Sequence, residues 1–188
     1  MLIYDDLLQK KKKLAVIGLG YVGLPLALAF AEKVAVIGYD VDEKRISLLK
    51  QGIDPSKAVE GEAFANKDIL FTSEAALLQE AGCFIVAVPT PVDQHKAPDL
   101  QALLHASEAI GSVLKRGDYV VFESTVHPGC TEEECLPVLE ERSGLQSSGD
   151  FKLGYSPERI SSLQTPGDIC RSERPLPGKF SQLIYWNL

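Results

Sequence analysis

Three glycines near the amino terminus have a spacing that suits the binding of a phosphate-containing cofactor. Gly18, Gly20 and Gly23 follow the G-x-G-x-x-G pattern and come directly after a short apolar run. The first glycine allows a tight turn, the second lets the backbone approach a pyrophosphate, and the third lets the next helix pack closely on the strand. That helix is expected to run from Tyr21, followed by Val22, to about Glu32, and would direct its free amides and positive dipole end at the phosphates. The pattern predicts a dinucleotide-binding loop.

A carboxylate stands where a ribose-binding group is expected. Asp40 ends the second apolar run, 22 residues after Gly18, where a doubly wound fold places an acid on the adenosine ribose hydroxyls. Because this carboxylate would repel a 2′-phosphate, NAD is predicted as the cofactor in preference to NADP. Arg45 is within reach of the adenosine or the pyrophosphate, with a solvated helix arginine as the alternative. A glycine turn with a chance acid is the alternative for the whole pattern.

Two later apolar runs end in residues that are predicted to line the same crevice. One run breaks at Pro89, Thr90 and Pro91, and the other stops just before Ser124 and Thr125. Ligands of doubly wound sheets bind outside the carboxyl ends of the strands. These five residues are therefore candidates for the cofactor site, alongside the glycine loop. A turn or helix cap is the alternative role for Thr125.

Apolar runs alternate with amphipathic segments along the chain. Strands are expected at 14–17, 34–39, 69–72, 83–88, 119–122 and 151–156, and helices at 21–32, 42–50, 74–79, 99–114 and 131–141. Ser73, Asp99 and Thr131 are expected to cap the last three helices, and Glu134 completes a capping box. This alternation predicts an α/β fold, a Rossmann-type doubly wound parallel sheet with right-handed crossovers.

The expected organisation has three parts. Residues 1–12 form a leader, and the basic run Lys10 to Lys13, where the leader meets the first strand, is interpreted as solvated. Residues 13–160 form the cofactor-binding domain. Residues 161–188 contain three prolines and no sustained periodicity, so they are expected to be a divergent, poorly ordered or loosely docked tail.

Composition narrows the classes of function. The 188 residues are 45% hydrophobic and 24% charged, with a net charge of −7. This charge argues against nucleic-acid and anionic-membrane partners. No apolar stretch reaches the roughly 18 residues of a membrane span, and the amino terminus has no signal-peptide layout, so a cytoplasmic location is expected.

The four cysteines are Cys83, Cys130, Cys135 and Cys170. None forms a C-x-x-C pair and no histidine spacing accompanies them, so no metal site is predicted. Disulfides are not expected either, because the chain is expected to be cytoplasmic. Cys83 lies in an apolar run and is interpreted as a core residue.

Five longer motifs follow one another between residues 13 and 160: Val16 to Pro25, Gly38 to Asp40 with Arg45, Val88 to Asp93 with Pro98 to Leu100, Glu123 to Glu133, and Gly154 to Ile160. In their order and spacing these motifs resemble the UDP-glucose and GDP-mannose dehydrogenase family of nucleotide-sugar 6-dehydrogenases. Within that family the chain is most similar to the UDP-N-acetylhexosamine (glucosamine or galactosamine) 6-dehydrogenases of surface-polysaccharide synthesis.

The resemblance implies that a sugar C6 alcohol is oxidised twice to a carboxylate, with two NAD as hydride acceptors. A family cysteine holds the carbon first as a thiohemiacetal and then as a thioester, which water hydrolyses. The resemblance places Thr125 on a catalytic water or the substrate oxygen. It places Glu158 near the hydrolytic water as base or charge stabiliser. A surface carboxylate after a proline is the alternative for Glu158.

Other parts of the family pattern are missing from these residues. The nucleophilic cysteine segment, the catalytic lysine and asparagine, the central dimer helix and the UDP-binding domain have no counterpart, and Cys170 lacks the nucleophile's context. The expectation is therefore an NAD-binding part, truncated before the central helix and inactive by itself, of an enzyme whose full-length relatives form homo-oligomers. One alternative is a non-catalytic NAD-binding or interaction module, a degraded paralogue. Another is a different Rossmann dehydrogenase, such as the 3-hydroxyacyl-CoA or 6-phosphogluconate type.

Overall fold

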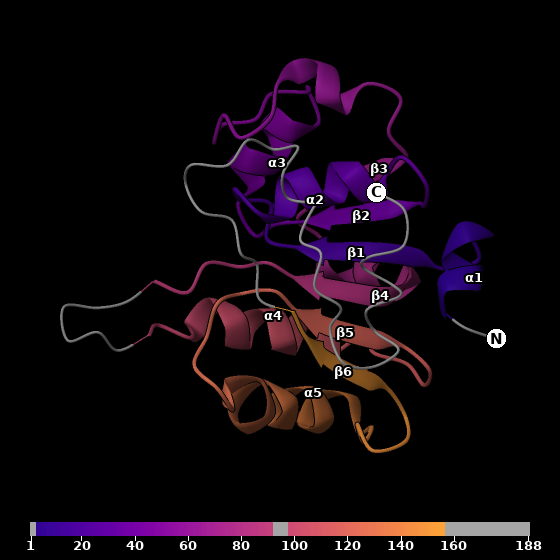
Figure 1. Ribbon diagram of the computed structural model, residues 1–188, viewed down its shortest axis with the longest axis vertical. Helices are drawn as coiled ribbons and strands as arrows, with labels where there is room; N and C mark the ends of the chain where they lie inside the picture. Colours follow the sequence, from indigo (N-terminus) through magenta and orange to yellow (C-terminus); the bar gives the residue numbers. More distant parts are fainter. Residues whose placement is uncertain (1–2, 92–97, 157–188) are drawn as a thin grey trace.

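Six parallel strands form one sheet at the centre of the computed structural model, which describes residues 3–91 and 98–156. The strands are β1 (Lys13–Ile17), β2 (Val36–Tyr39), β3 (Ile69–Thr72), β4 (Ala81–Val86), β5 (Tyr119–Phe122) and β6 (Lys152–Tyr155). Their order across the sheet is β3-β2-β1-β4-β5-β6 (Figure 1). The order reverses between β1 and β4, the place where a crevice for dinucleotides opens in such sheets. The predicted doubly wound parallel sheet is confirmed.

Helices cover both faces of this sheet, which explains why its strands are continuous apolar runs. The helices are α1 (Ile3–Leu8), α2 (Gly23–Phe30), α3 (Glu43–Leu49), α4 (Gln101–Gly111) and α5 (Leu136–Ser143). In β1, Leu14 and Val16 pack in one core cluster with residues of α1, α2 and α3. Ala15 and Ile17 point to the other face and pack with residues of α4 and α5. Alternate side chains of a single strand thus serve two cores.

Two predicted helices have a different form in the structure. The segment expected as a helix at 74–79 is the 3-10 turn η2 (Ala75–Glu80), which runs directly into β4 and buries Leu78. Short 3-10 segments are common as connectors between longer elements. Ser73 does not cap it; the Thr72 hydroxyl accepts the Glu74 amide instead.

The segment expected as a helix from 131 begins as the π turn η3 (Thr131–Cys135) and continues as α5. Thr131 therefore lies inside a turn of the helix and makes no capping hydrogen bond, so the predicted capping box is wrong. Asp99 does act at the start of α4, because its Oδ1 accepts the Gln101 amide at 2.9 Å. Another 3-10 segment, η1 (Gly61–Phe64), lies in the connection between α3 and β3.

The basic run before β1 is paired with acids rather than simply solvated. Lys10, Lys12 and Lys13 form ion pairs with Asp68, Asp118 and Glu80. Just upstream, helix α1 buries Ile3 and Leu7 against the sheet. The segment before β1 is thus held at the amino ends of the strands, away from the crevice (Figure 1).

The Lys12–Asp118 pair leads to a prediction about stability. The Asp118 side chain is 0% exposed, and it accepts hydrogen bonds from Lys12 Nζ at 2.8 Å and from the Lys115 amide at 2.9 Å. Replacing Asp118 with alanine leaves both donors without their acceptor, and we expect a loss of about 2–4 kcal/mol of unfolding free energy, measured by urea denaturation.

The exposed pair between Arg142 and Glu108 provides the matched control. These side chains are 53% and 45% exposed, so Glu108→Gln should change the free energy of unfolding by less than about 1 kcal/mol. If the two substitutions lowered the free energy of unfolding equally, the burial of Asp118 would not be the reason for its contribution to stability.

Candidate functional site

The three glycines of the loop after β1 differ in the space that a side chain would have. Gly18 has φ +89°, and a Cβ there would lie 2.9 Å from the carbonyl oxygen of Ala87. A Cβ at Gly23 would collide with the carbonyl oxygen of Gly18. Around the Cβ position of Gly20, no atom of residues 3–91 and 98–156 lies within 4 Å. Packing within the chain therefore requires Gly18 and Gly23, whereas the space beside Gly20 is free for a ligand.

The backbone of this loop offers hydrogen-bond donors to an anion. Helix α2 begins at Gly23, two residues later than expected, so Tyr21 and Val22 belong to the turn before it. Among the described residues, the amides of Gly20, Tyr21 and Val22 have no acceptor. Free amides beside open space at a helix start are what a pyrophosphate needs, so the loop fits a dinucleotide.

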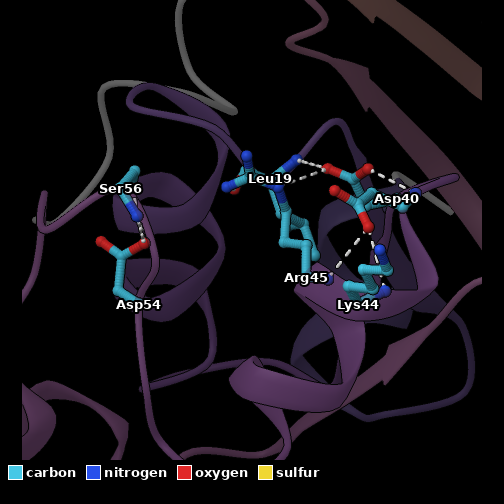
Figure 2. Close-up of polar contacts among 7 residues, drawn as sticks. Leu19, Asp40, Lys44, Arg45, Asp54 and Ser56 are labelled. Carbon is cyan, nitrogen blue, oxygen red and sulfur yellow. Dashed lines mark hydrogen bonds and ion pairs between the residues drawn. The ribbon is translucent and has the colours of Figure 1, made fainter.

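Asp40 and Arg45 both contact the glycine loop (Figure 2). Asp40 Oδ2 accepts the amide of Leu19 at 2.9 Å, and Arg45 Nη1 donates to the carbonyl oxygen of Leu19 at 3.2 Å. Arg45 Nε lies 3.6 Å from Asp40 Oδ2. The structure thus brings together the carboxylate after β2, the guanidinium of α3 and the loop after β1, as the sequence spacing predicted. Whether they bind the ribose and pyrophosphate stays a prediction.

The orientation of Asp40 is set from both sides. Its Oδ1 accepts the amide of Asp42 at 3.0 Å, while Asp42 itself caps α3 by accepting the amides of Lys44 and Arg45. The Asp40 side chain remains 14% exposed. Each carboxylate oxygen can accept more than one hydrogen bond, so the exposed lone pairs can still receive two ribose hydroxyls.

Asp54, which the sequence reasoning did not single out, holds the loop after α3 (Figure 2). Its carboxylate accepts hydrogen bonds from Ser56, Ala58 and Val59. Burial raises the pKa of this carboxyl, but these hydrogen bonds outweigh burial and hold the pKa below its ordinary value. An Asp-Pro pair in a polar connection is the one sequence signal that could have indicated such a turn.

The loops after β4 and β5 are joined by side-chain hydroxyls. Because β4 ends at Val86 rather than at the expected residue 88, the whole stretch up to Pro91 is loop. Thr90 Oγ1 donates to the carbonyl oxygen of Thr125 at 2.7 Å, and Ser124 Oγ donates to that of Val88 at 2.7 Å. The predicted residues Thr90, Ser124 and Thr125 therefore come together.

These loops also contact the glycine turn and β6. Gly18 packs against Ala87, which places the β4 loop beside the glycine loop. Pro89 and Pro91 are exposed at the same end of the sheet. The Tyr155 hydroxyl, at the end of β6, lies 3.3 Å from the Val126 carbonyl oxygen and 3.4 Å from its nitrogen. Sequence reasoning missed this contact. Glu158, the other predicted catalytic residue, lies outside the described residues.

Three cysteines are described, and all are free and buried. Cys83 packs in the core beside β1, as predicted. Cys130 and Cys135 pack on the opposite face under α4, and Cys170 lies outside the described residues. No group of three or more His, Cys, Asp or Glu that could hold a metal ion occurs within residues 3–91 and 98–156.

We expect these three thiols to be unreactive in the folded protein. Burial raises the pKa of Cys83 and of Cys135 to about 12, and burial also raises the pKa of Cys130. Thiolates are the reactive form. In a Cys170→Ser variant, a thiol-specific chromogenic disulfide at pH 8 should report no fast-reacting thiol until denaturant is added, and then three. A thiol that reacts rapidly without denaturant would contradict this expectation.

The same pKa values predict the alkaline stability of the fold. An unfolded chain ionises its thiols near pH 9, while Cys83 and Cys135 stay protonated in the folded protein up to about 12. Their contribution to stability is therefore complete below pH 9 and is lost as the pH rises toward 12. The urea concentration at the midpoint of unfolding should therefore be lower at pH 10.5 than at pH 8.

Comparison with known proteins identifies relatives of the whole described domain. Residues 12–182 match the model of the NAD-binding domain of the UDP-glucose/GDP-mannose dehydrogenase family. The UDP-N-acetyl-D-glucosamine 6-dehydrogenase of Pseudomonas aeruginosa is 54% identical over 160 residues, which cover 85% of this chain and 37% of that protein. The UDP-N-acetyl-D-mannosamine dehydrogenase of Campylobacter jejuni is 36% identical over 179 residues, which cover 88% of this chain and 43% of that protein.

Solved structures agree with this match. The NDP-N-acetyl-D-galactosaminuronic acid dehydrogenase of Methanosarcina mazei superposes with a TM-score of 0.74 at 34% identity, covering 86% of this chain and 38% of that one. The GDP-mannose dehydrogenase of Pseudomonas aeruginosa gives a TM-score of 0.75 at 25% identity, covering 82% and 38%. The chain therefore spans about two fifths of the length of these relatives. In the part of the chain that the structure describes, no helix is long and apolar enough to cross a membrane.

Proposed function

The chain belongs to the UDP-glucose/GDP-mannose dehydrogenase family and carries its NAD-binding domain, and from this premise we propose that it is the cofactor-binding part of a UDP-N-acetylhexosamine 6-dehydrogenase. The reaction would convert the C6 alcohol of the sugar to a uronic acid. The identity of 54% to a UDP-N-acetyl-D-glucosamine 6-dehydrogenase supports this choice of sugar class. We also propose that the full-length protein forms homo-oligomers. A cytoplasmic location belongs to the same proposal and fits the free thiols of Cys83, Cys130 and Cys135.

One observation carries the proposal, the arrangement of Leu19 between Asp40 and Arg45 beside the open space at Gly20. The free amides of the loop would bind the pyrophosphate, and Asp40 would accept the ribose hydroxyls. NAD, when bound, supplies the hydride acceptor for oxidation of the C6 carbon.

Residues at the other half of the crevice would act on the nicotinamide and the sugar. Thr90 and Pro91 are proposed to line the nicotinamide ribose. Thr125, which is exposed at the end of β5, would hydrogen-bond the substrate oxygen or a water. Glu158 would act near the hydrolytic water as a base or as a charge stabiliser. These roles are carried over from the family motifs.

Binding and turnover are tested separately. We expect calorimetric titration to show that residues 1–188 bind NADH and ADP-ribose, with NADPH at least about tenfold weaker because Asp40 opposes a 2′-phosphate. With NAD and a UDP-N-acetylhexosamine, absorbance at the NADH band should stay constant, since the family's nucleophilic cysteine segment is not among these residues. Absence of NADH and ADP-ribose binding would refute the proposed cofactor site, and steady NADH production would refute the proposed inactivity of these residues alone.

A further inference from the structure

Two short hydrogen bonds cross between the loops after β4 and β5. Ser124 Oγ donates to the Val88 carbonyl oxygen, and Thr90 Oγ1 donates to the Thr125 carbonyl oxygen, both at 2.7 Å. Ser124 is only 6% exposed. Each loop thus donates one hydrogen bond from a hydroxyl and accepts one at a backbone carbonyl. Neither loop can shift along the crevice without breaking a hydrogen bond to the other.

A third hydroxyl reaches the same backbone from β6. Tyr155 stands beside Phe122 in the parallel pairing of β5 and β6. Its hydroxyl lies 3.3 Å from the carbonyl oxygen and 3.4 Å from the nitrogen of Val126. These contacts are longer than those of Thr90 and Ser124, so they are weaker. The backbone of Thr125 and Val126 is thus contacted by one hydroxyl from the loop after β4 and by another from the last residue of β6, the two strands that flank β5.

The Thr125 hydroxyl itself is left available. Thr125 is exposed, and among the described residues its Oγ1 has no hydrogen-bond partner. The hydroxyls of Thr90 and Ser124, in contrast, are already used within the protein. Three hydroxyl side chains near the crevice therefore divide into two that hold backbone and one that faces outward.

We propose that Thr90, Ser124 and Tyr155 are positioning residues that form a hydroxyl clamp on residues 124–126 and thereby set the position of the Thr125 hydroxyl in the nicotinamide half of the site. This inference rests on the proposed function. It assigns the Thr90 and Ser124 hydroxyls to the loop backbone, while the backbone of Thr90 is left to line the nicotinamide ribose. It adds Tyr155, whose contribution reaches the ligand only through Thr125.

The clamp is tested by comparing two ligands. ADP-ribose lacks the nicotinamide ring, so it leaves empty the part of the site where the Thr125 hydroxyl is proposed to act, whereas NADH fills that part as well. Thr90→Val and Tyr155→Phe remove one hydroxyl each and keep the shape of the side chain. We expect Thr90→Val to weaken NADH binding about tenfold and Tyr155→Phe about threefold, while ADP-ribose binding changes less than about twofold. Thr90→Ser, which restores the hydroxyl, should bind NADH as the wild type does.

Ser112→Ala is the matched control. Ser112 Oγ also donates to a backbone carbonyl, that of Glu108 at 2.8 Å, but at the exposed carboxyl end of α4. This variant should leave the ratio of NADH to ADP-ribose affinity unchanged. A loss of general stability would weaken both ligands together, so a selective change in the ratio separates positioning from a merely structural role.

A double-mutant cycle tests whether the clamp acts through Thr125. Once Thr125→Val has removed the outward hydroxyl, the additional change Tyr155→Phe should alter NADH affinity less than twofold, because coupled residues show non-additive effects. Fully additive losses, or an unchanged ligand ratio in all clamp variants, would overturn the proposal while leaving the cofactor site intact. If the wild type bound neither ligand, the proposed function would fail first, and the clamp with it.

Discussion

Replacing Gly23 with alanine is expected to destabilise the fold by about 3 kcal/mol and to abolish measurable NADH binding. The added methyl would collide with the carbonyl oxygen of Gly18 and would lie 3.3 Å from the Cβ of Ala87. Both neighbours belong to backbone segments packed on the sheet, so neither can yield as a flexible side chain would. Helix α2 would have to move away from β1, and the phosphate-facing turn would move with it. Urea denaturation and calorimetric titration measure the two effects.

Gly20→Ala provides the control in the same loop. In the part of the chain that the structure describes, no atom lies within 4 Å of the Cβ position of Gly20, and the φ of Gly20 lies outside the left-handed region that favours glycine. Stability should therefore change by less than about 0.5 kcal/mol. NADH binding should still fall about tenfold or more, because the methyl occupies the space through which the pyrophosphate approaches the backbone. Unimpaired NADH binding by Gly20→Ala would show that the phosphates do not lie there.

Replacing Asp40 with asparagine is expected to reverse the exclusion of NADPH. The substitution removes the negative charge that opposes a 2′-phosphate, and it frees Arg45, whose Nε lies 3.6 Å from the carboxylate, to pair with that phosphate. We expect NADH to bind about tenfold more weakly and NADPH about tenfold more tightly than in the wild type, each equivalent to about 1.4 kcal/mol. Titrations with both nucleotides at one ionic strength measure the change in preference.

Asp42→Asn tests whether the effect belongs to Asp40 alone. Asp42 is two residues away and exposed, and its carboxylate caps α3 through the amides of Lys44 and Arg45. This variant removes the same charge and keeps a capping side chain, so the preference for NADH should stay within about twofold of the wild type. An equal loss of preference in both variants would mean that general charge near the crevice, rather than a ribose contact, selects the cofactor.

Some elements were predicted correctly and others were not, and each outcome has its own physical cause. Strand β5 was predicted at its observed residues, 119–122, because a fully buried parallel strand must be apolar on both faces. The helix expected at 74–79 was wrong, because its apolar composition could not reveal that β4 begins immediately afterwards. The capping box at Thr131 failed because a π turn opens that helix and places the threonine inside it.

The parallel doubly wound sheet, the glycine loop and the acid after β2 could all be predicted from the order of the residues alone. These features follow from local requirements, namely burial of apolar runs, φ and close packing at glycines, and a fixed spacing between strand ends. The hydrogen-bond partners of the polar side chains, in contrast, became clear only from the folded chain. The hydrogen bonds of Asp40 to Leu19, Thr90 to Thr125 and Tyr155 to Val126 each join residues between 21 and 35 positions apart. A hydroxyl or carboxylate has no periodic signature, so its partner is set by which strand ends lie side by side.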